Sequence, residues 1–319
     1  LLLPIAFGML LSNLPMIKDS SAIMMHTEFF TNPEYMTDGK YINVGYICQH
    51  GGLLDLLYLG VKLGIYPPLI FVGIGCMTDF GPLIANPKSI LLGAAAQFGV
   101  FFTFVGALVL SALVPSINFG IKEAASIGII GGADGPTAIY VTKSLAPALL
   151  PAIAVAAYSY MALIPVIQPP IMKLMTRKKD RMIVMEQLRP VSKTEKILFP
   201  IIVTIIVALI IPDAVSLVGC LMLGNLMKES GVVERLTKMA QNELMNIITL
   251  FLGVTVGATA TASSFLSAQT IGIIVLGLIA FCFSTVGGLF LGDIMCWVTK
   301  GKVNPLIGSA GVSAVPMAA

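Results

Sequence analysis

The stretch that most constrains this chain lies near its middle, at residues 126–142, and reads SIGIIGGADGPTAIYVT. Gly131, Gly132 and Pro136 disfavour a continuous helix, because Gly loses backbone entropy and Pro removes an amide donor. Asp134 stands at this break. Within a bilayer, such a break is tolerated only where freed backbone groups are buried in protein or line a wet cavity, and a carboxylate there marks an ion or substrate path. The sequence therefore predicts a broken membrane helix whose oxygen ligands suit a small, hard cation.

The composition places this break in a membrane protein. Of the 319 residues, 57% are hydrophobic and 11% are charged, with a mean hydropathy of +0.94, whereas soluble domains carry about 25% charged residues. At roughly 20 residues a span, the chain has room for about nine to eleven membrane segments. We expect an all-α polytopic membrane protein. Nothing resembles a nucleic-acid-binding module, and the five Cys and two His are too scattered to predict a metal site.

Both ends of the chain are apolar. LLLPIAFGMLLSNLPM, at residues 1–16, lacks a start Met and a basic n-region, so we interpret it as the second part of a membrane helix and not as a signal peptide. The other end, SAVPMAA, stops within an apolar run. We expect further membrane segments on both sides.

A basic stretch divides the chain. Residues 173–196 hold eight Lys or Arg against three acidic residues, and such loops stay in the cytoplasm under the positive-inside rule. A solvated loop without a binding role and a docking surface for an acidic partner both fit this composition. The predicted organisation is a first membrane half at 1–172, a basic cytoplasmic loop at 173–196 and a second membrane half at 197–319.

Three weak internal matches relate the two halves. FVGIGCMTDFGPLIANP at 71–87 resembles FLGVTVGATATASSFLS at 251–267, VGAL at 105 resembles VGGL at 286, and IIGGADGP at 129 resembles LIGSAGVS at 306. The offsets are 180, 181 and 177 residues, in the same order. Paired interrupted segments indicate an inverted-repeat transporter with its site near the midplane. The predicted fold is thus two weakly similar, inverted repeats whose broken helices meet there; inversion itself needs an odd number of spans in each half.

The second-half break, KGKVNPLIGSAGVSAVP, supplies the remaining candidate ligands. Asn304 offers a neutral amide oxygen, so Asp134 and Asn304 together would present one negative charge to a monovalent cation. Gly308 and Gly311 would let carbonyl oxygens approach an ion, and Ser313 offers a hydroxyl. Ordinary roles are the alternatives: a helix cap for Asp134, a turn for Asn304, close packing for the glycines and a back-bonded hydroxyl for Ser313.

Other polar residues lie inside apolar segments. Tyr160 precedes Lys173 by 13 residues, which is about 20 Å along a helix and near mid-bilayer. A buried phenol there can pass a proton, although packing with one hydrogen bond is its commoner role. Gln168 roughly shares the helix face of Tyr160, whereas Tyr158 points elsewhere. Asp79 lies at another break, in MTDFGPLIANP, where an ion or gating role and helix capping both fit.

Five stretches together resemble one family: MTDFGPLIANP, GGADGPTAIYVT, AVAAYSYMALIPVIQPP, QNELMNIITLFLGVTVGATATASSFL and KVNPLIGSAGVSAVPMAA. They are similar to the beta subunit of the sodium-pumping biotin-dependent decarboxylases, which act on oxaloacetate, methylmalonyl-CoA, glutaconyl-CoA or malonate. The resemblance covers nearly the whole chain, and its GGADGPTA and NPLIGSAGVSAVP stretches are highly specific. The family begins with an extra membrane helix and continues beyond MAA with further segments.

The resemblance implies a multi-pass sodium pump of the prokaryotic inner membrane. A carboxyltransferase subunit loads biotin, and decarboxylation of the carboxybiotin at the cytoplasmic face would consume a proton and drive sodium ions outward. The family pattern implies sodium liganding at Asp134, Asn304 and Ser313, and Gly308 matches the glycine of the same motif. The implied catalytic residues are Asp134, Tyr160 and Ser313, the last two in the proton path.

The resemblance also implies a scaffold and a moving core within a homotrimer in the lipid bilayer, with a small membrane gamma subunit and the carboxyltransferase and biotin-carrier subunit as partners. Two other classes stay open. One is a sodium/proton antiporter or sodium-coupled carboxylate symporter of related fold, which needs no biotin partner; the other is a purely structural membrane subunit. The sequence does not tell which acid or acyl-CoA is decarboxylated, because that choice lies in the carboxyltransferase subunit.

Overall fold

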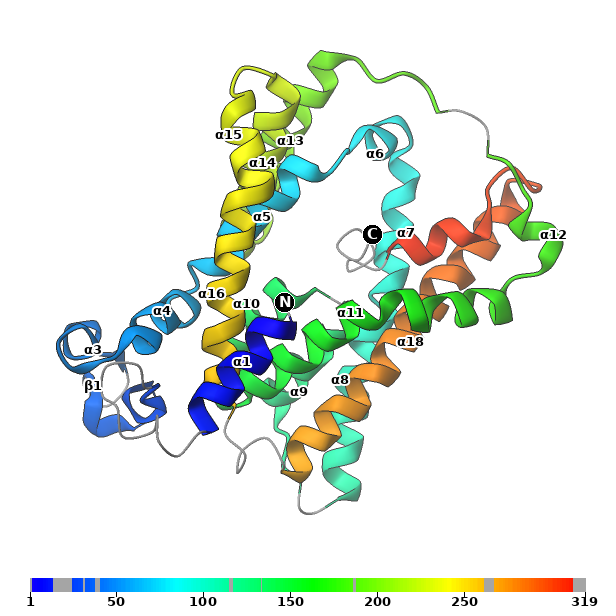
Figure 1. The fold of residues 1–319 in the computed structure, drawn as a ribbon. Helices are drawn as coiled ribbons and strands as arrows, with labels where there is room; N and C mark the ends of the chain where they lie inside the picture. The colour runs from blue at the N-terminus through cyan, green and yellow to red at the C-terminus, as the bar shows by residue number, and fades with distance from the viewer. Residues whose placement is uncertain are drawn as a thin grey trace.

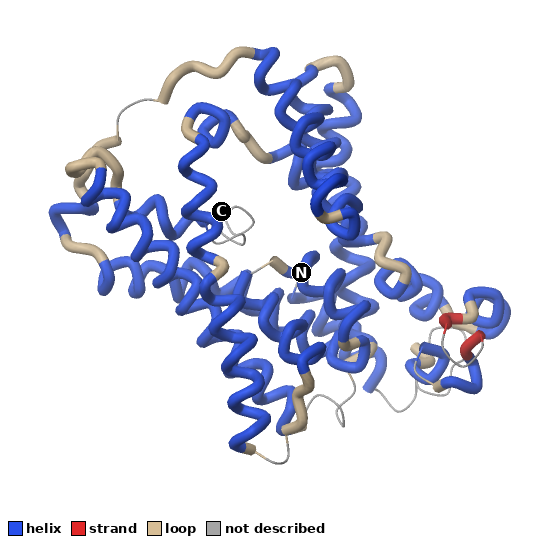
Figure 2. The backbone as a smooth tube through the Cα atoms, turned by 180° about the vertical axis from the view of Figure 1, so that it is seen from behind, coloured by secondary structure: helices blue, strands red, loops and turns tan. Residues whose placement is uncertain are grey.

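The structure, a computed structural model, describes residues 2–13, 25–30, 32–37, 41–114, 117–132, 134–185, 188–260 and 267–311. This part of the chain is almost entirely helical (Figure 2), which confirms the all-α prediction. Its α-helices are α1 (Leu2–Asn13), α3 (Val44–His50), α4 (Leu53–Lys62), α5 (Tyr66–Met77), α6 (Gly81–Ala85), α7 (Ile90–Ala96), α8 (Phe98–Leu113), α9 (Ile121–Gly128), α10 (Gly135–Leu145), α11 (Leu150–Met175), α12 (Lys178–Arg181), α13 (Lys193–Ile210), α14 (Val215–Ser230), α15 (Glu234–Met239), α16 (Met245–Ala258) and α18 (Ala268–Val298).

Short elements connect these helices. The 3-10 helices are η1 (Thr27–Phe30), η2 (Pro33–Tyr35), η3 (Pro87–Ser89), η4 (Ile129–Gly132), η5 (Pro147–Leu149), η6 (Pro212–Ala214) and η8 (Pro305–Gly311); η7 (Ala240–Leu244) is a π-helix, and β1 (Met36–Thr37) pairs antiparallel with β2 (Tyr41–Ile42). The N-terminal polar region, with α3 and β1, projects from the body of the molecule (Figure 1). The fully buried carboxylate of Asp55 anchors it by accepting backbone N–H groups from His26 at 2.8 Å and Gly52 at 2.9 Å.

Two described stretches are long and apolar enough to cross a membrane, Pro87–Leu113 and Ala268–Val298. Bent pairs raise this to four: Leu53–Lys62 with Tyr66–Met77, bent by 68°, and Pro147–Tyr160 with Leu163–Met175, bent by 60°. By length and composition, the described residues thus contain two to four candidate spans, fewer than the nine to eleven segments for which the whole sequence has room. The reason is that Gly and Pro cut the apolar sequence into pieces shorter than the roughly 20 residues that a bilayer needs.

Two helix pairs pack backbone against backbone. Helix α5 lies along α14, and α1 lies along α16 (Figure 1). Each helix has a glycine whose missing Cβ makes room for a carbonyl oxygen of its partner: Gly75 and Gly224 in the first pair, Gly8 and Gly257 in the second. Because α1 and α5 precede the basic loop whereas α14 and α16 follow it, the two predicted halves interlock.

Helix α18 is the longest described helix and packs along α8 and α11 as well as against η4 and η8. The sequence contains two apolar runs here, separated by Ser284 and Thr285, yet the helix continues unbroken. The hydroxyls of both residues are fully buried and hydrogen-bonded, Thr285 to the Phe281 carbonyl of its own helix at 3.0 Å and Ser284 to the carbonyl of Gly131 in η4. Buried hydroxyls with partners do not interrupt a helix.

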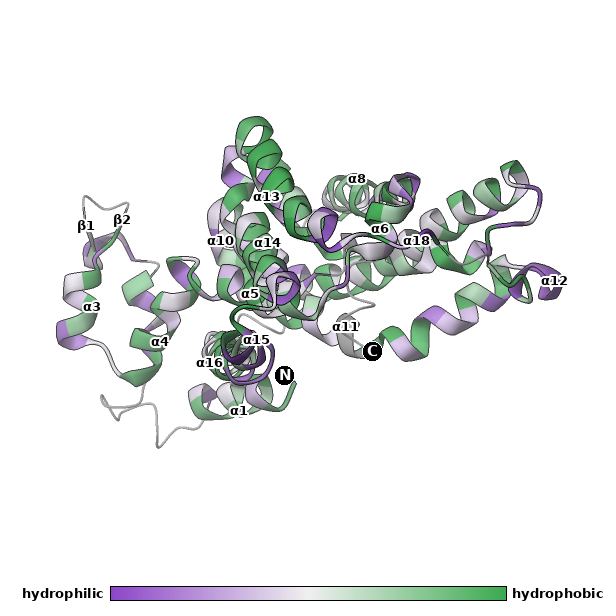
Figure 3. Cartoon of the chain, turned by 90° about the horizontal axis from the view of Figure 1, so that it is seen from above, coloured by the Kyte–Doolittle hydropathy of each residue, from purple (hydrophilic) through white to green (hydrophobic). Residues whose placement is uncertain are grey.

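The outer helices present apolar faces. Helix α13 exposes Ile202, Ile205 and Leu209, and α8 exposes Phe101 and other large side chains. In Figure 3, α8 and α13 are predominantly hydrophobic, whereas α12 is hydrophilic and lies at one end of the molecule. Exposed apolar faces of this extent are typical of surfaces that contact lipid, which agrees with the predicted membrane protein.

Candidate functional site

The first predicted break lies between α9 and α10. After α9, the 3-10 helix η4 carries the chain through Gly131, and α10 begins at Gly135; residue 133 lies outside the described residues. Asp134 is the N-cap of α10, and its half-buried carboxylate accepts the hydroxyl of Thr137 at 2.6 Å and the backbone N–H of Thr137 at 3.4 Å. The break and the capping role are confirmed. The start of a helix also favours a negative charge, so capping leaves a cation-binding role open.

The second break follows α18 and leads into η8. Here the Asn304 side-chain oxygen accepts the backbone N–H of Leu306 at 3.0 Å, which is the turn role that the sequence left open. Its amide nitrogen donates to the carbonyls of Arg181 at 3.2 Å and Ile183 at 3.0 Å. Asn304 therefore ties this break to α12 and the residues after it, within the basic loop. Sodium liganding by its oxygen stays a prediction.

One face of α18 brings the two breaks to adjacent helical turns. The Ser284 hydroxyl donates to the carbonyl of Gly131 in η4. Gly288, four residues further on, contacts the backbone of Gly308 in η8, and Gly292 packs against Pro305. Four residues of α-helix rise about 6 Å. Gly131 and Gly308, one from each break, thus lie beside neighbouring turns of one helix.

The two tyrosines of α11 point to different segments, as their spacing of two residues predicted. The Tyr160 hydroxyl donates to the carbonyl of Ile274 in α18, and its ring packs on Gly277. This is the packing role with one hydrogen bond, and the proton-path role stays a prediction. Tyr158, expected to point elsewhere, has its ring against Gly135, the residue next to the carboxylate of the first break. The glycine at that position is the sequence signal for such close contact.

Gln168 belongs to the second break. Its amide nitrogen donates to the carbonyl of Ser309 in η8 at 2.9 Å, and its side chain is 6% exposed. Tyr160 and Gln168 lie in the two arms of the bent helix α11 and contact different segments, α18 and η8; the roughly shared helix face stays a prediction. Ser284 was missed altogether, because its surroundings in the sequence do not distinguish it from a back-bonded serine.

The described groups around the breaks include carboxylate, hydroxyl and carbonyl oxygens. Hard oxygen ligands of this kind suit alkali and alkaline-earth cations. The described residues contain no group of three His, Cys, Asp or Glu placed to hold a metal ion. Ser313, predicted as a ligand and in the proton path, lies outside the described residues.

Asp79 occupies a separate break between α5 and α6. Its carboxylate accepts the backbone N–H of Gly81 at 2.9 Å and the ammonium group of Lys196 at 3.2 Å, and its side chain is 56% exposed. The Gly81 N–H, aided by Lys196, lowers the pKa of this carboxyl. The geometry is that of an exposed helix cap.

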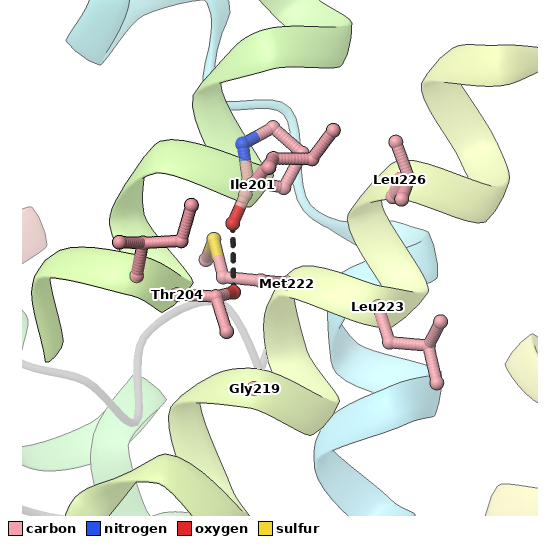
Figure 4. Close-up of a pocket in the computed structure, with 8 residues that line it drawn as sticks. Ile201, Thr204, Gly219, Met222, Leu223 and Leu226 are labelled. Carbon is pink, nitrogen blue, oxygen red and sulfur yellow. Dashed lines mark hydrogen bonds between the residues drawn. The ribbon is translucent and has the colours of Figure 1, made fainter. Parts of the chain in front are cut away.

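A cavity of about 330 Å³ lies between α13 and α14 and is lined by Pro200, Ile201, Thr204, Ile205, Gly219, Met222, Leu223 and Leu226 (Figure 4). The hydroxyl of Thr204, the one polar side chain in this lining, donates to the carbonyl of Pro200 at 2.7 Å. The cavity thus offers an apolar surface and no charged group. Its chemistry does not suit a cation site.

Comparisons with known proteins bear on what these breaks do. A family model described as "Na+-transporting oxaloacetate decarboxylase beta subunit" matches residues 1–319. Over its full length, the chain is 57% identical to methylmalonyl-CoA decarboxylase subunit beta of Propionigenium modestum, of which it covers 78%. It is 53% identical to glutaconyl-CoA decarboxylase subunit beta of Acidaminococcus fermentans and 51% identical to the oxaloacetate decarboxylase beta chain of Haemophilus ducreyi, with all of this chain matched and 76% and 80% of those proteins covered.

These relatives are named for three different substrates, yet their identities to this chain lie close together. The comparison therefore identifies the type of subunit but does not distinguish among the three substrates. The family match over every residue agrees with the resemblance found in the sequence motifs. This chain belongs to the family of beta subunits of Na+-transporting decarboxylases.

Proposed function

We propose that this chain is the membrane subunit that couples decarboxylation of carboxybiotin to outward sodium transport. Carboxybiotin is presented at the cytoplasmic face by a biotin-carrier partner. Breaking the bond between the biotin ring nitrogen and the carboxylate releases carbon dioxide, and the nitrogen takes up one proton. Membership in the family of Na+-transporting decarboxylase beta subunits supports the sodium and decarboxylase parts of this proposal.

The meeting of the two breaks on α18 is the observation that carries the proposal. Gly131 and Gly308 come from segments 177 residues apart in the sequence, and both lie on one face of α18 at adjacent turns. Interrupted helices inside a bilayer are tolerated where the freed backbone groups are buried in protein or line a polar cavity. We therefore assign the sodium pocket to the space that these two segments share.

The roles of the site residues follow from their chemistry. Asp134 provides the negative charge for sodium, and the backbone at Gly308 with the side chains of Asn304 and Ser313 completes the set of ligands. Tyr160 and Ser313 serve the proton path. Sodium arriving from the cytoplasm displaces a proton from Asp134 toward carboxybiotin, and the loss of carbon dioxide makes the reverse step unfavourable.

The interlocked helix pairs support inverted repeats. The α5/α14 and α16/α1 pairs each join a helix from before the basic loop to one from after it, with reciprocal glycine contacts. A Cβ on Gly99 in α8 would lie 2.6 Å from the carbonyl oxygen of Ala280 in α18. These residues are separated by the 181-residue offset of the VGAL and VGGL matches. Direct contact between repeat-related residues is expected beside a pseudo-two-fold axis.

The proposed setting is a multi-pass homotrimer in a prokaryotic inner membrane, with a small gamma subunit and the carboxyltransferase and biotin-carrier subunit as partners. The basic loop at 173–196 marks the cytoplasmic face. Because Asn304 bonds to the carbonyls of Arg181 and Ile183 in that loop, the second break is connected to the face where carboxybiotin arrives.

The test is sodium uptake by inverted vesicles containing the complete complex with Asp134→Asn. Asn caps a helix about as well as Asp, so α10 stays intact while the charge is lost. We expect sodium uptake to fall about 100-fold or more, since a buried charge near a cation is worth several kcal/mol. Asp79→Asn, at the exposed break, is the control and is expected to keep uptake within about twofold of the unmodified complex.

Two outcomes would decide against the proposal. Uptake at the normal rate in the Asp134→Asn complex would remove the assigned sodium pocket. Sodium movement that continues after avidin has blocked the biotin of the unmodified complex would favour the antiporter or symporter alternative.

A further inference from the structure

Ser284 makes a hydrogen bond that distinguishes it from the other buried hydroxyls in its surroundings. Serine and threonine within a helix commonly bond back to the carbonyl four residues earlier. Thr285 does this with Phe281 at 3.0 Å, and Thr103 does it with Gly99 at 2.6 Å. Ser284 instead donates to the carbonyl of Gly131, which lies 153 residues away in sequence. Its hydroxyl therefore holds another segment and not its own helix.

The segment that Ser284 holds leads directly to Asp134. The carbonyl of Gly131 belongs to η4, three residues before the carboxylate, and its backbone also lies against Gly99 of α8. Backbone contact with Gly99 fixes one side of η4. The hydrogen bond from the Ser284 hydroxyl fixes the direction of the Gly131 carbonyl. The hydroxyl oxygen keeps lone pairs after donating its hydrogen.

Ser284 also links the position of the first break to that of the second through α18. Along the face of α18 that carries Gly277, Ser284, Gly288 and Gly292, Ser284 has the one side chain with a polar atom. One turn further along this face, Gly288 contacts Gly308 of the second break. The hydrogen bond from Ser284 thus holds the first break one helical turn from the place where α18 contacts the second.

We propose that Ser284 is a positioning residue for sodium binding. This inference rests on the sodium pocket proposed above. By fixing the carbonyl of Gly131, its hydroxyl keeps η4 in the arrangement that receives the ion beside Asp134. Loss of the hydroxyl leaves Asp134 in place but lets the Gly131 carbonyl turn, so sodium binds more weakly while the chemical step is little changed.

The experiment measures decarboxylation by the purified complete complex as a function of sodium concentration, for Ser284→Ala and the matched control Thr285→Val. Both variants remove one fully buried hydroxyl from adjacent positions of α18. Ser284→Ala is expected to raise the sodium concentration for half-maximal activity about tenfold, because tenfold corresponds to about 1.4 kcal/mol, within the range for one hydrogen bond. The maximal rate is expected to stay within about threefold. Thr285→Val is expected to shift neither quantity by more than about twofold.

Equal sodium dependence in both variants, or a fall only in maximal rate for Ser284→Ala, would overturn the positioning role. Ser284→Cys supplies a second variant, since a thiol is a weaker donor, and its half-maximal sodium concentration should fall between those of the unmodified and Ala complexes. A Cys value beyond the Ala value would also count against the proposal. Failure of the proposed function is distinguishable, because the unmodified complex itself would then show no dependence on sodium.

Discussion

The two breaks beside α18 use their polar side chains in opposite ways. In the first, Asp134 bonds to Thr137, three residues further along the same segment. In the second, Asn304 bonds to the carbonyls of Arg181 and Ile183, which are 123 and 121 residues away. The polar side chain of the first break thus bonds within its own segment, whereas that of the second reaches the basic loop.

This difference assigns distinct parts to the two breaks in the proposed pump. A carboxylate that caps its own half-helix keeps its geometry when distant loops move. An amide shared between a turn and a loop changes its hydrogen bonds when that loop moves. An event at the cytoplasmic face would therefore reach the pocket through Asn304 and η8, while the position of the Asp134 carboxylate stays set by its own half-helix.

The largest expected effect tests what the two breaks have in common, their backbone contact. A Cβ on Gly131 would lie 2.6 Å from the carbonyl carbon of Gly99, and one on Gly308 would overlap the carbonyl oxygen of Gly288. We expect Gly131→Ala and Gly308→Ala each to lower decarboxylation and sodium uptake about 100-fold, because this corresponds to about 2.7 kcal/mol, near the upper end of the roughly 1–3 kcal/mol that overpacking costs. Activity per assembled complex is the measurement.

Gly132→Ala is the matched control for this pair. Its Cβ would meet only ordinary contacts, the nearest being the side-chain oxygen of Gln97 at 3.5 Å. We expect near-normal activity. Normal activity of the Gly308→Ala complex would contradict the close backbone contact between the second break and α18. Of the two breaks, only the first would then be packed against its neighbours in this way.

How far the sequence could predict this arrangement depends on the range of each interaction. The break at Asp134 and its capping role follow from local chemistry, since Gly, Pro and a carboxylate within a few residues determine them. The partners of Asn304 and Ser284 could not be predicted, because both bonds join segments more than 100 residues apart. The bend of α11 was missed for a related reason: Pro inside a helix indicates a kink but not its angle.

The second-largest expected effect tests the difference in side-chain hydrogen bonding between the two breaks. Asn304→Ala removes both donors to the loop, so the backbone at Arg181 should open more often. We expect trypsin to cleave after Arg181 about fivefold faster, measured against cleavage after the exposed Lys178 as an internal reference, since net hydrogen-bond contributions are about 1 kcal/mol. Peptides are quantified by mass spectrometry from the assembled complex.

Asp134→Asn is the control for this measurement, because its cap makes no contact with the loop and the cleavage ratio should not change. If cleavage after Arg181 were accelerated equally in Asn304→Ala and Asp134→Asn, both breaks would be coupled to the basic loop to the same extent. That result would remove the division of roles between Asp134 and Asn304.

The smallest expected effect concerns the other end of the basic loop. Arg189 pairs with Glu195 at 2.9 Å, with both side chains well exposed, and Glu195 also forms a capping box with Ser192 at the start of α13. Arg189, followed by the Ser192 backbone N–H, lowers the pKa of Glu195 to about 2 from its usual 4.5. A lowered folded-state pKa means that the contribution to stability is complete above 4.5 and is lost as the pH falls toward 2.

We therefore expect that Arg189→Ala changes the melting temperature of the complex little, and by the same amount at every pH between about 6 and 9. Exposed ion pairs contribute little to stability, and the Glu195 carboxyl stays ionised over this pH range. The tryptic cleavage ratio at Arg181 should not change either. If instead Arg189→Ala accelerated that cleavage as much as Asn304→Ala does, the loop would be held as a whole by its surface charges, and the special connection of the second break to Arg181 and Ile183 would lose its support.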